Sequence, residues 1–288
     1  MNFPYLTQAK APLTCIVSAV NEFGEDISVS IPAERALTVY VDKRELVTLM
    51  TLGAHPELLV LGYLQNQRLV NNIEAIESIT VDWEVGAAAV KTRQGIADIE
   101  EKTSRRVVTT GCGQGSVFGG LMDEVDQIKL PPDASITQSQ LYALVNTIRL
   151  KETTYKSAGS VHACALFDTS SSEPEMLLFV EDVGRHNAID TIAGWMSIEA
   201  EPCDAANRAF YTTGRLTSEM VIKSAQMGVP IVVSRSGITQ MGHQVAQAVG
   251  LCAIGRATNK RFVCYTSTQR LVLEPGLAGI KPEVVKSV

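Results

Sequence analysis

The second half of the chain alternates apolar strands with helices, and this alternation constrains its fold more than any other feature. Four apolar runs predict buried strands: VHACALF (161–167), MLLFV (176–180), AFYTT (209–213) and PIVVS (230–234). Helical segments are expected nearby at 188–198, 218–227 and 239–249. Strands that alternate with helices form a layered sheet, so this part of the chain belongs to the α/β class.

The first part of the chain predicts a different, β-rich module over residues 13–91. The runs LTCIVSAV and ISVSI flank the turn NEFGED, and ALTVYV and SITVDWEV follow as further strands. One helix is expected in HPELLVLGYLQNQRLV, where Pro56 suits the first helical position. We therefore expect a small α+β domain over 1–110 and an α/β domain over 111–288. The alternative in which the last strand returns to the N-terminal domain stays open.

Composition and charge narrow the classes of function. The chain has 288 residues, 45% of them hydrophobic, which is enough for a sizeable core. Its net charge of −6 gives no general attraction to nucleic acid or to an anionic membrane, so any basic site must be local. No apolar run reaches the roughly 18 residues of a membrane span, and the first residues lack a signal-peptide pattern. We expect a cytoplasmic protein with no nucleic-acid or membrane partner.

Three loops in the second half share one chemistry. EDVGRHN (181–187), GRLTSE (214–219) and SRSGIT (234–239) each follow a predicted strand and carry Gly and Arg beside a helix start. If the strands run parallel, Arg185, Arg215 and Arg235 meet at one edge of the sheet, where α/β proteins bind ligands. Helix N-termini attract anions and the arginine fork matches phosphate. The three loops together predict an anion or nucleotide site.

Simpler interpretations exist for each loop taken alone. A single arginine at a helix start is more often solvated or ion-paired, and Thr217 and Thr239 serve equally well as N-caps. Glu181 and Asp182 could act as an acid/base pair, but we favour a supporting role for both. His186 could be a general base or a phosphate donor, and its Gly-Arg loop argues against a wholly buried, structural histidine.

Histidine and cysteine positions give little support for a metal site. His162 and Cys164 stand two apart on a predicted strand, which permits metal ligation or a core pair. Zinc deaminases use His-x-Glu and Pro-Cys-x-x-Cys, whereas this chain has His162-Ala-Cys164 and a lone Cys203 after proline. A deaminase is therefore disfavoured, and no metal ligand is assigned. The six cysteines show no Cys-x-x-Cys spacing, which favours reduced thiols.

One cysteine stands apart because it lies in the most glycine-rich stretch. VVTTGCGQGSVFGG (107–120) contains five glycines around Cys112. Glycine has the most backbone freedom to lose on folding, so such a loop usually serves a turn or the close approach of backbone to a ligand. A flexible thiol there suits a nucleophile that must visit more than one partner.

Several motifs together resemble the FdhD/NarQ family of formate dehydrogenase accessory sulfurtransferases. They are LMTLGAHPELLVLGYL, GSVHACALF, EDVGRHNAIDTI and TTGRLTSEMVIKSAQMGVPIVVSRSG, and the similarity runs in order from about residue 35 to 273. The resemblance implies a cytidine-deaminase-like, three-layer α/β fold for the second domain. It also implies a task, which is to pass persulfide sulfur from a cysteine desulfurase to the molybdenum or tungsten bis-pyranopterin guanine dinucleotide cofactor of the formate dehydrogenase catalytic subunit.

The resemblance makes Cys112 the persulfide carrier, with one departure from the family pattern. The family loop is usually Cys-Gly-x-Cys-Gly, and this chain has Cys112-Gly-Gln-Gly-Ser116. A second loop cysteine that would resolve the persulfide is missing, and Cys164 or Cys203 could replace it only through unexpected proximity. A single-thiol mechanism is the prediction.

The resemblance also implies a set of cofactor-binding residues, for which a guanine nucleotide such as GDP is a mimic. The family segment Gly-Phe-x-Arg-x-x-Arg-Phe aligns near the carboxyl end, where Arg256 replaces an aromatic residue and Thr258 an arginine. A basic surface loop is the simpler alternative there. The predicted cofactor-binding residues are Gly184, Arg185, His186, Asn187, Arg215, Ser218, Arg235, Ser236, Arg256, Ala257, Thr258, Asn259, Lys260 and Arg261.

Two other functions remain open. The missing cysteine is also consistent with a cofactor-binding chaperone for formate dehydrogenase that does not transfer sulfur. A redox-sensing thiol protein is a weaker alternative. The family resemblance implies a homodimer.

Overall fold

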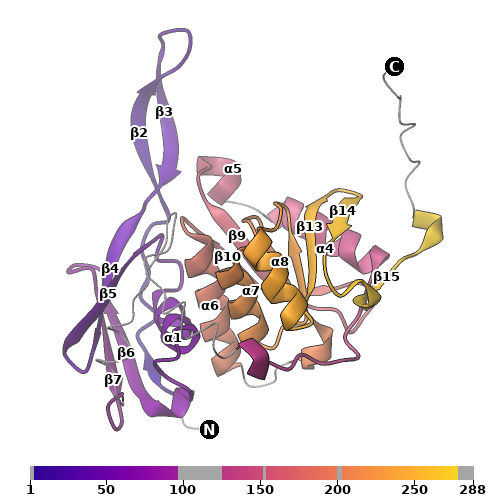
Figure 1. Ribbon diagram of the computed structural model, residues 1–288. Coiled ribbons are helices and arrows are strands. Elements are labelled where there is room, and N and C mark those ends of the chain that lie inside the picture. The colour runs from indigo at the N-terminus through magenta and orange to yellow at the C-terminus, as the bar shows by residue number, and fades with distance from the viewer. Residues whose placement is uncertain (1–2, 97–124, 152–153, 200–202, 278–288) are drawn as a thin grey trace.

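The computed structural model describes residues 3–96, 125–151, 154–199 and 203–277, and Figure 1 shows their arrangement. The N-terminal part contains a five-stranded sheet with the order β1-β6-β7-β4-β5. Alternating side chains such as Leu37, Val39 and Val41 of β4 enter its core. The strands are β1 (Tyr5–Leu6), β4 (Arg35–Val41), β5 (Arg44–Thr51), β6 (Ile76–Asp82) and β7 (Ala87–Thr92).

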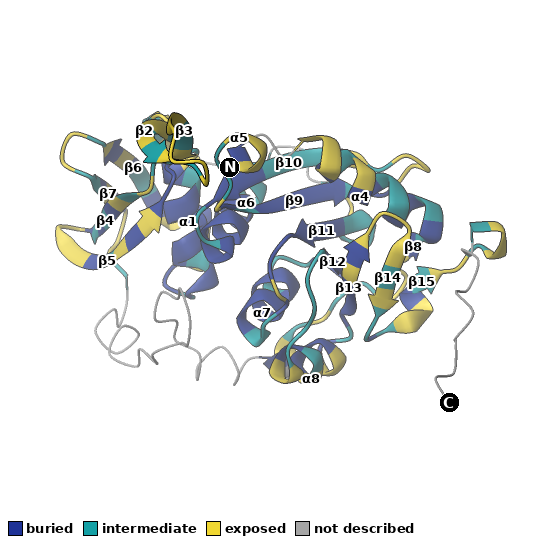
Figure 2. Cartoon of the chain, turned by 90° about the horizontal axis from the view of Figure 1, so that it is seen from above, coloured by how far each residue is buried: buried dark blue, intermediate teal, exposed yellow. Residues whose placement is uncertain are grey.

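A two-stranded hairpin projects from this sheet (Figure 1). It consists of β2 (Thr14–Val20) and β3 (Asp26–Pro32), paired antiparallel. The residues are exposed or half-buried along both strands (Figure 2). The turn NEFGED closes it, with Gly24 at a φ of 79°, as the sequence predicts.

Helix α1 (Pro56–Asn66) joins the two halves of the molecule. It begins with Pro56 at the first helical position and is buried on nearly all sides, because the N-terminal sheet lies on one side and α6 on the other. A Cβ atom built on Gly62 would lie 1.7 Å from the carbonyl oxygen of Asp190, and one built on Gly194 would lie 2.0 Å from that of Leu58. The two helices therefore touch backbone to backbone.

The second part is built on a six-stranded sheet with the order β10-β9-β11-β12-β13-β14. Strands β11, β12 and β13 are parallel, and β9 runs antiparallel to both of its neighbours, so β10 points the same way as β11. The strands are β9 (His162–Asp168), β10 (Glu175–Asp182), β11 (Arg208–Thr212), β12 (Ile231–Ser234), β13 (Cys252–Thr258) and β14 (Arg261–Cys264).

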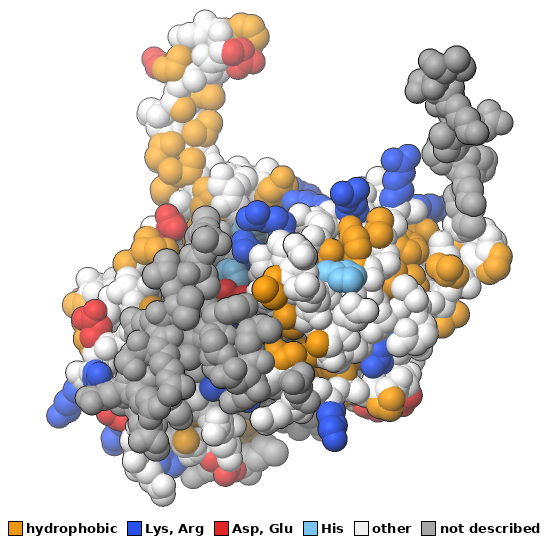
Figure 3. All heavy atoms as spheres, viewed as in Figure 1, with side chains coloured by type: hydrophobic (Ala, Val, Ile, Leu, Met, Phe, Trp, Pro, Cys, Tyr) orange, Lys and Arg blue, Asp and Glu red, His pale blue; other side chains and the backbone are white. Residues whose placement is uncertain are grey.

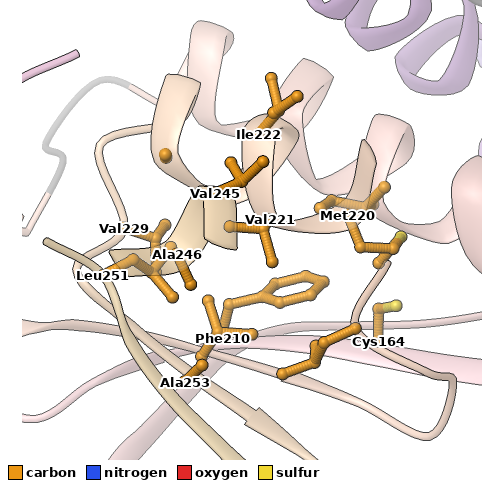
Figure 4. Close-up of a cluster of buried hydrophobic side chains, with 14 of the residues drawn as sticks. Cys164, Phe210, Met220, Val221, Ile222, Val229, Val245, Ala246, Leu251 and Ala253 are labelled. Atoms are coloured by element: carbon orange, nitrogen blue, oxygen red, sulfur yellow. The ribbon is translucent and has the colours of Figure 1, made fainter. Parts of the chain in front are cut away.

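Helices cover both faces of this sheet and form three layers. Helices α6 (Arg185–Ile198), α7 (Ser218–Gln226) and α8 (Gln240–Ala248) pack over one face, where Phe210 lies at the centre of the cluster in Figure 4. Helix α4 (Gln138–Lys151) packs over the other face with a second cluster that includes Phe167. The predicted α/β class and three-layer order are confirmed.

The remaining elements are short. Helix α5 (Thr154–Ala158) lies near the base of the hairpin, and β8 (Ile136–Thr137) pairs with β15 (Leu271–Val272). This last described strand thus pairs within the second domain and not with the N-terminal sheet. The predicted boundary near 110 falls outside the described residues, and the cytidine-deaminase-like assignment stays a prediction.

Candidate functional site

The carboxyl ends of β10, β11 and β12 bring the three Gly-Arg loops to one edge of the sheet. These strands point in the same direction, so Arg185, Arg215 and Arg235 all follow strand ends on that edge. We call these three arginines, with His162 at the start of β9, the arginine edge. Lys and Arg side chains gather along the upper rim of the second domain, beside the base of the hairpin (Figure 3).

The positive charges of all three arginines of the edge act on the pKa of His162. Its pKa is lowered, first by burial and then by the positive charges of Arg185, Arg235 and Arg215. Its Nδ1 lies 3.3 Å from the hydroxyl of Thr213. Because one imidazole is affected by all three guanidinium groups, the prediction that the loops converge is confirmed.

Arg185 is the innermost of the three arginines. It is the first residue of α6 and is buried, and a Cβ atom built on Gly214 would lie 2.6 Å from its Cδ. The glycine therefore leaves the space through which the Arg185 side chain passes. Arg215 follows Gly214 directly and is exposed, so the two guanidinium groups lie at different depths of one edge.

Of the helices that begin at the arginine edge, α7 and α8 each have a threonine cap. Thr217 Oγ1 accepts from the backbone amide of Met220 at 3.5 Å, and Thr239 Oγ1 accepts from that of Gly242 at 3.1 Å. The N-cap prediction is confirmed at both positions. Ser218 is the first residue of α7 and is half-buried. The other free N–H groups of these helix starts make the edge favourable to anions.

Tyr155 is a member of this edge that sequence reasoning missed. The Arg235 guanidinium lies 5.2 Å from the centre of the Tyr155 ring, within cation–π range. Tyr155 lies on α5, whose first amides donate to the buried Glu181 carboxylate, Thr154 N at 2.8 Å and Tyr155 N at 3.0 Å. Glu181 thus has the expected supporting role, although it supports α5 and not the arginine loop.

The predicted cofactor-binding segment 256–261 contacts the arginine edge through a backbone hydrogen bond. The amide of Arg256 donates to the carbonyl oxygen of Ser236 at 2.6 Å, which places the β13–β14 hairpin beside the Arg235 loop. Ala257 is buried in the core, so it offers no exposed group to a ligand. The exposed side chains of the segment are Arg256, Thr258, Asn259, Lys260 and Arg261.

Asp182 and Asn187 have structural partners in the N-terminal part. Asp182 accepts from Thr51 Oγ1 at 2.5 Å and from the amide of Gly184 at 3.2 Å. Asn187 Nδ2 donates to Asp182 at 2.9 Å and to the carbonyl oxygen of Met50 at 2.6 Å. Both amide hydrogens of Asn187 are therefore used to hold the EDVGRHN loop against the end of β5. Asp182 has the supporting role that we expected.

The expectation that His186 is not a wholly buried histidine is wrong. Its side chain lies in the first turn of α6 with only 6% of the residue exposed, and its Nδ1 is 3.4 Å from Glu219 Oε1. Burial, Lys223, Arg185 and His162 lower the pKa of His186 to about 2, so the imidazole is neutral. The loop sequence misled because α6 begins at Arg185, one residue earlier, and turns His186 inward.

His186 belongs to a buried polar network that the sequence did not reveal. Lys223 Nζ is fully buried and lies 2.9 Å from Asp190 Oδ1 and 3.4 Å from Glu219 Oε1. Asp190 also accepts from Asn66 Nδ2 at 2.7 Å, which extends the network from α7 through α6 to α1. The residues that make these contacts between helices are at least 33 positions apart in the sequence. No local sequence pattern therefore predicts the contacts.

The environments of Cys164 and Cys203 disfavour their thiolate forms. Cys112 lies outside the described residues, so its predicted role stays a prediction. Cys164 lies inside the core (Figure 4), where burial raises the pKa of its thiol to about 12. Burial also raises the pKa of Cys203. The five described cysteines are free thiols.

The described ranges contain no group of three His, Cys, Asp or Glu side chains that could hold a metal ion.

Fold and edge together define a class: a two-part α/β protein with a cationic site at the carboxyl ends of its strands. The model of the FdhD/NarQ family matches residues 32–272, and the chain belongs to this family. The resemblance seen in the sequence is thereby confirmed.

Individual relatives agree with this assignment. The chain is 31% identical to the sulfur carrier protein FdhD of Bacillus subtilis over 83% of its own length and 88% of the relative's. It is 26% identical to the protein of that name from Listeria innocua, over 86% of this chain and 93% of the relative. A crystal structure of a formate dehydrogenase accessory protein from Desulfotalea psychrophila shares the fold, with a TM-score of 0.71 at 22% identity, over 91% of this chain and all of that one.

Within the described residues, none of the helices is long and apolar enough to cross a membrane.

Proposed function

We propose that this protein is a sulfur carrier for formate dehydrogenase. It takes persulfide sulfur from a cysteine desulfurase and passes it to a molybdenum or tungsten bis-pyranopterin guanine dinucleotide, which is its substrate and is destined for the dehydrogenase catalytic subunit. The observation that carries the proposal is the convergence of Arg185, Arg215 and Arg235 on one strand edge, in a chain whose relatives are named sulfur carrier proteins.

The arginine edge has the chemistry that a diphosphate requires. Arg215 is exposed, and Arg235 is half-buried under Tyr155, so both can offer a planar fork to phosphate oxygens. Helices α7 and α8 each have nine residues and begin at this edge, where their dipoles favour negative charge. A guanine nucleotide is the expected mimic of the bound cofactor.

The β13–β14 hairpin extends the cationic surface. Arg256, Lys260 and Arg261 are exposed, and the amide of Arg256 is bonded to the Ser236 carbonyl in the adjacent loop. A cofactor with two nucleotide arms carries several phosphates, and a second cationic segment beside the first offers them additional contacts. The departures from the family pattern change which side chains make these contacts and leave the segment basic.

Sulfur transfer to Cys112 balances without an added oxidant. The Cys112 thiolate attacks the outer sulfur of the desulfurase persulfide, a new S–S bond forms on Cys112, and the desulfurase cysteine leaves as a thiolate. Cys164 cannot substitute, because a pKa of about 12 leaves roughly one thiolate in 10⁵ at pH 7. In this mechanism Cys112 is the carrier.

Intact-protein mass spectrometry after incubation with a cysteine desulfurase and cysteine tests the sulfur step. The native protein and Cys15→Ser, which removes an exposed cysteine of the hairpin, should each gain one sulfur atom, and Cys112→Ser should gain none. If Cys112→Ser gains as much sulfur as the native protein, the carrier assignment fails. If no form gains sulfur while GDP still binds, the chaperone function is the correct one.

A further inference from the structure

A second cavity lies at the opposite end of the six-stranded sheet from the arginine edge. It has a volume of about 440 Å³ and lies where the carboxyl ends of α1, α6 and α7 meet the start of β11. Arg208 at the start of β11 lines it, whereas Thr212 at the end of the same strand precedes the Arg215 loop. A five-residue strand spans on the order of 15 Å, so the cavity and the edge are separate sites.

Cationic and neutral polar groups line this cavity. Arg68 and Arg208 contribute guanidinium groups, and the side-chain amides come from Gln65, Asn66, Asn71 and Gln226. No carboxylate is among the described residues that line it. A neighbouring cavity of about 290 Å³ shares Arg208 but is lined by Asp168, Glu175 and Glu199. The absence of acidic groups therefore distinguishes the larger cavity from its neighbour.

Arg208 keeps its charge available to this cavity. Its Nη2 donates to the carbonyl oxygen of Cys203 at 3.0 Å, and its Nη1 lies 3.4 Å from that of Met227. Both acceptors are neutral, and Arg208 forms no ion pair with another residue of the described ranges. These contacts fix the guanidinium group, whose five N–H donors exceed the two that the carbonyls use.

We infer that this cavity binds a small organic anion with one to three carboxylate or phosphate groups. The guanidinium groups supply the recognition of the oxyanion, and Met196, Met227 and Val70 supply apolar wall for the rest of the molecule. The volume lies within the range of small-molecule sites, about 300–1,000 Å³. Inorganic phosphate alone would leave the apolar wall without a partner.

The ligand would touch both halves of the molecule. Arg68 and Asn71 follow α1 in the N-terminal part, and Arg208 and Gln226 belong to the second part. Asn66 lines the cavity and donates to the buried Asp190 carboxylate at 2.7 Å, so the cavity adjoins the network that holds α1 to α6. A molecule that binds the folded state here should therefore stabilise the contact between the two parts.

Isothermal titration calorimetry in a background that silences the arginine edge tests this site. The protein carrying Arg215→Gln and Arg235→Gln is titrated with citrate, with GMP and with inorganic phosphate. Citrate or GMP should bind, and Arg208→Gln should weaken that binding at least tenfold. Asn71→Glu is a second variant, because Asn71 is exposed and tolerates substitution while the added carboxylate repels the anion. Arg149→Gln, an exposed arginine on α4, is the matched control and should change nothing.

Three results would overturn the inference. One is that none of the probes binds at concentrations up to about 10 mM. Another is that phosphate binds as well as citrate and GMP, because the proposed ligand is organic. The third is that binding persists in both Arg208→Gln and Asn71→Glu. None of these results bears on sulfur transfer, which depends on Cys112, or on nucleotide binding at Arg215 and Arg235.

Discussion

Arg185 passes directly over Gly214, so that a Cβ atom at position 214 would lie 2.6 Å from Arg185 Cδ. The contact joins the first turn of α6 to the loop after β11. Gly214 is needed here for space and not for an unusual backbone conformation, since its φ is outside the left-handed region. The positions of Arg185 and Arg215 are therefore coupled through a residue that itself carries no charge.

Gly214→Ala should weaken GDP binding severalfold while the protein stays folded. The new methyl group displaces the Arg185 side chain, whose long stem can move at a cost of about 1–2 kcal/mol. Gly276→Ala is the matched control, because Gly276 lies outside the arginine edge and has no heavy atom within 4 Å of the added Cβ. Calorimetric titration with GDP compares the two, and equal affinity in both variants would show that Arg185 does not contribute to binding.

His186 should make the folded state sensitive to acid. In the unfolded chain its pKa returns to about 6.5, whereas in the folded protein it is lowered to about 2. Between these values the unfolded state binds the extra proton, so the free energy of unfolding falls as the pH drops below about 6.5, by roughly 1.4 kcal/mol per pH unit. His55 and His162 have pKa values lowered in the same direction and add to the slope.

Urea unfolding of the native protein and of His186→Gln at several pH values between about 8 and 5 measures this contribution. Glutamine keeps a neutral polar group beside Glu219 but does not titrate. The free energy of unfolding of the variant should therefore fall less steeply as the pH drops, by the slope that corresponds to one bound proton. Parallel pH curves for the two proteins would show that His186 is not buried as a neutral group.

The buried Lys223–Asp190 pair should behave as a unit. Burial alone would lower the pKa of Lys223, but the Asp190 and Glu219 carboxylates more than offset this and raise it, so the lysine is charged. Lys223→Met or Asp190→Asn each leaves a buried charge without its main partner and should cost about 3–5 kcal/mol. The double variant should cost clearly less than the sum of the two, as measured by urea unfolding in a double-mutant cycle. Strict additivity would indicate that the pair is not coupled.

Gly62→Ala should separate α1 from α6. Alanine normally favours a helix over glycine by about 1 kcal/mol, but here its Cβ would lie 1.7 Å from the Asp190 carbonyl oxygen, and backbone cannot give way as a side chain can. We expect a net loss of about 2–4 kcal/mol in the free energy of unfolding. Gly276→Ala, with open space around it, should be neutral within about 0.5 kcal/mol. A stabilised Gly62→Ala would contradict the backbone contact.

The sequence predicts the elements because their signals are local. Pro56 marks the start of α1, the NEFGED turn separates β2 from β3, and the threonines at 217 and 239 cap the helices that follow them. The arginine edge could also be predicted, because strands of the same direction in an α/β sheet end on one side and carry their loops there.

Contacts between distant helices could not be predicted in this way. His186, Asp190 and Lys223 are polar residues in helical segments, and the polarity of a residue alone favours exposure. Only the packing of α1 and α7 against α6 buries them and supplies their partners. Tyr155 was missed for the same reason, since α5 is placed at the edge by its bonds to Glu181, 26 and 27 residues away.

Tyr155 provides the last test, because its ring holds Arg235 at the arginine edge. The ring lies 5.2 Å from the guanidinium carbon, and a cation–π contact of this kind contributes about 0.5–2 kcal/mol, or roughly two- to thirtyfold in affinity if it orients Arg235 for phosphate. Tyr155→Ala should therefore weaken GDP binding within that range, and Tyr155→Phe should retain it because the ring remains. In an Arg235→Gln background the alanine substitution should lose most of its effect, because the cation is gone. If Tyr155→Phe binds GDP as weakly as Tyr155→Ala, the hydroxyl and not the ring is the group that matters, and the cation–π contact has no part in binding.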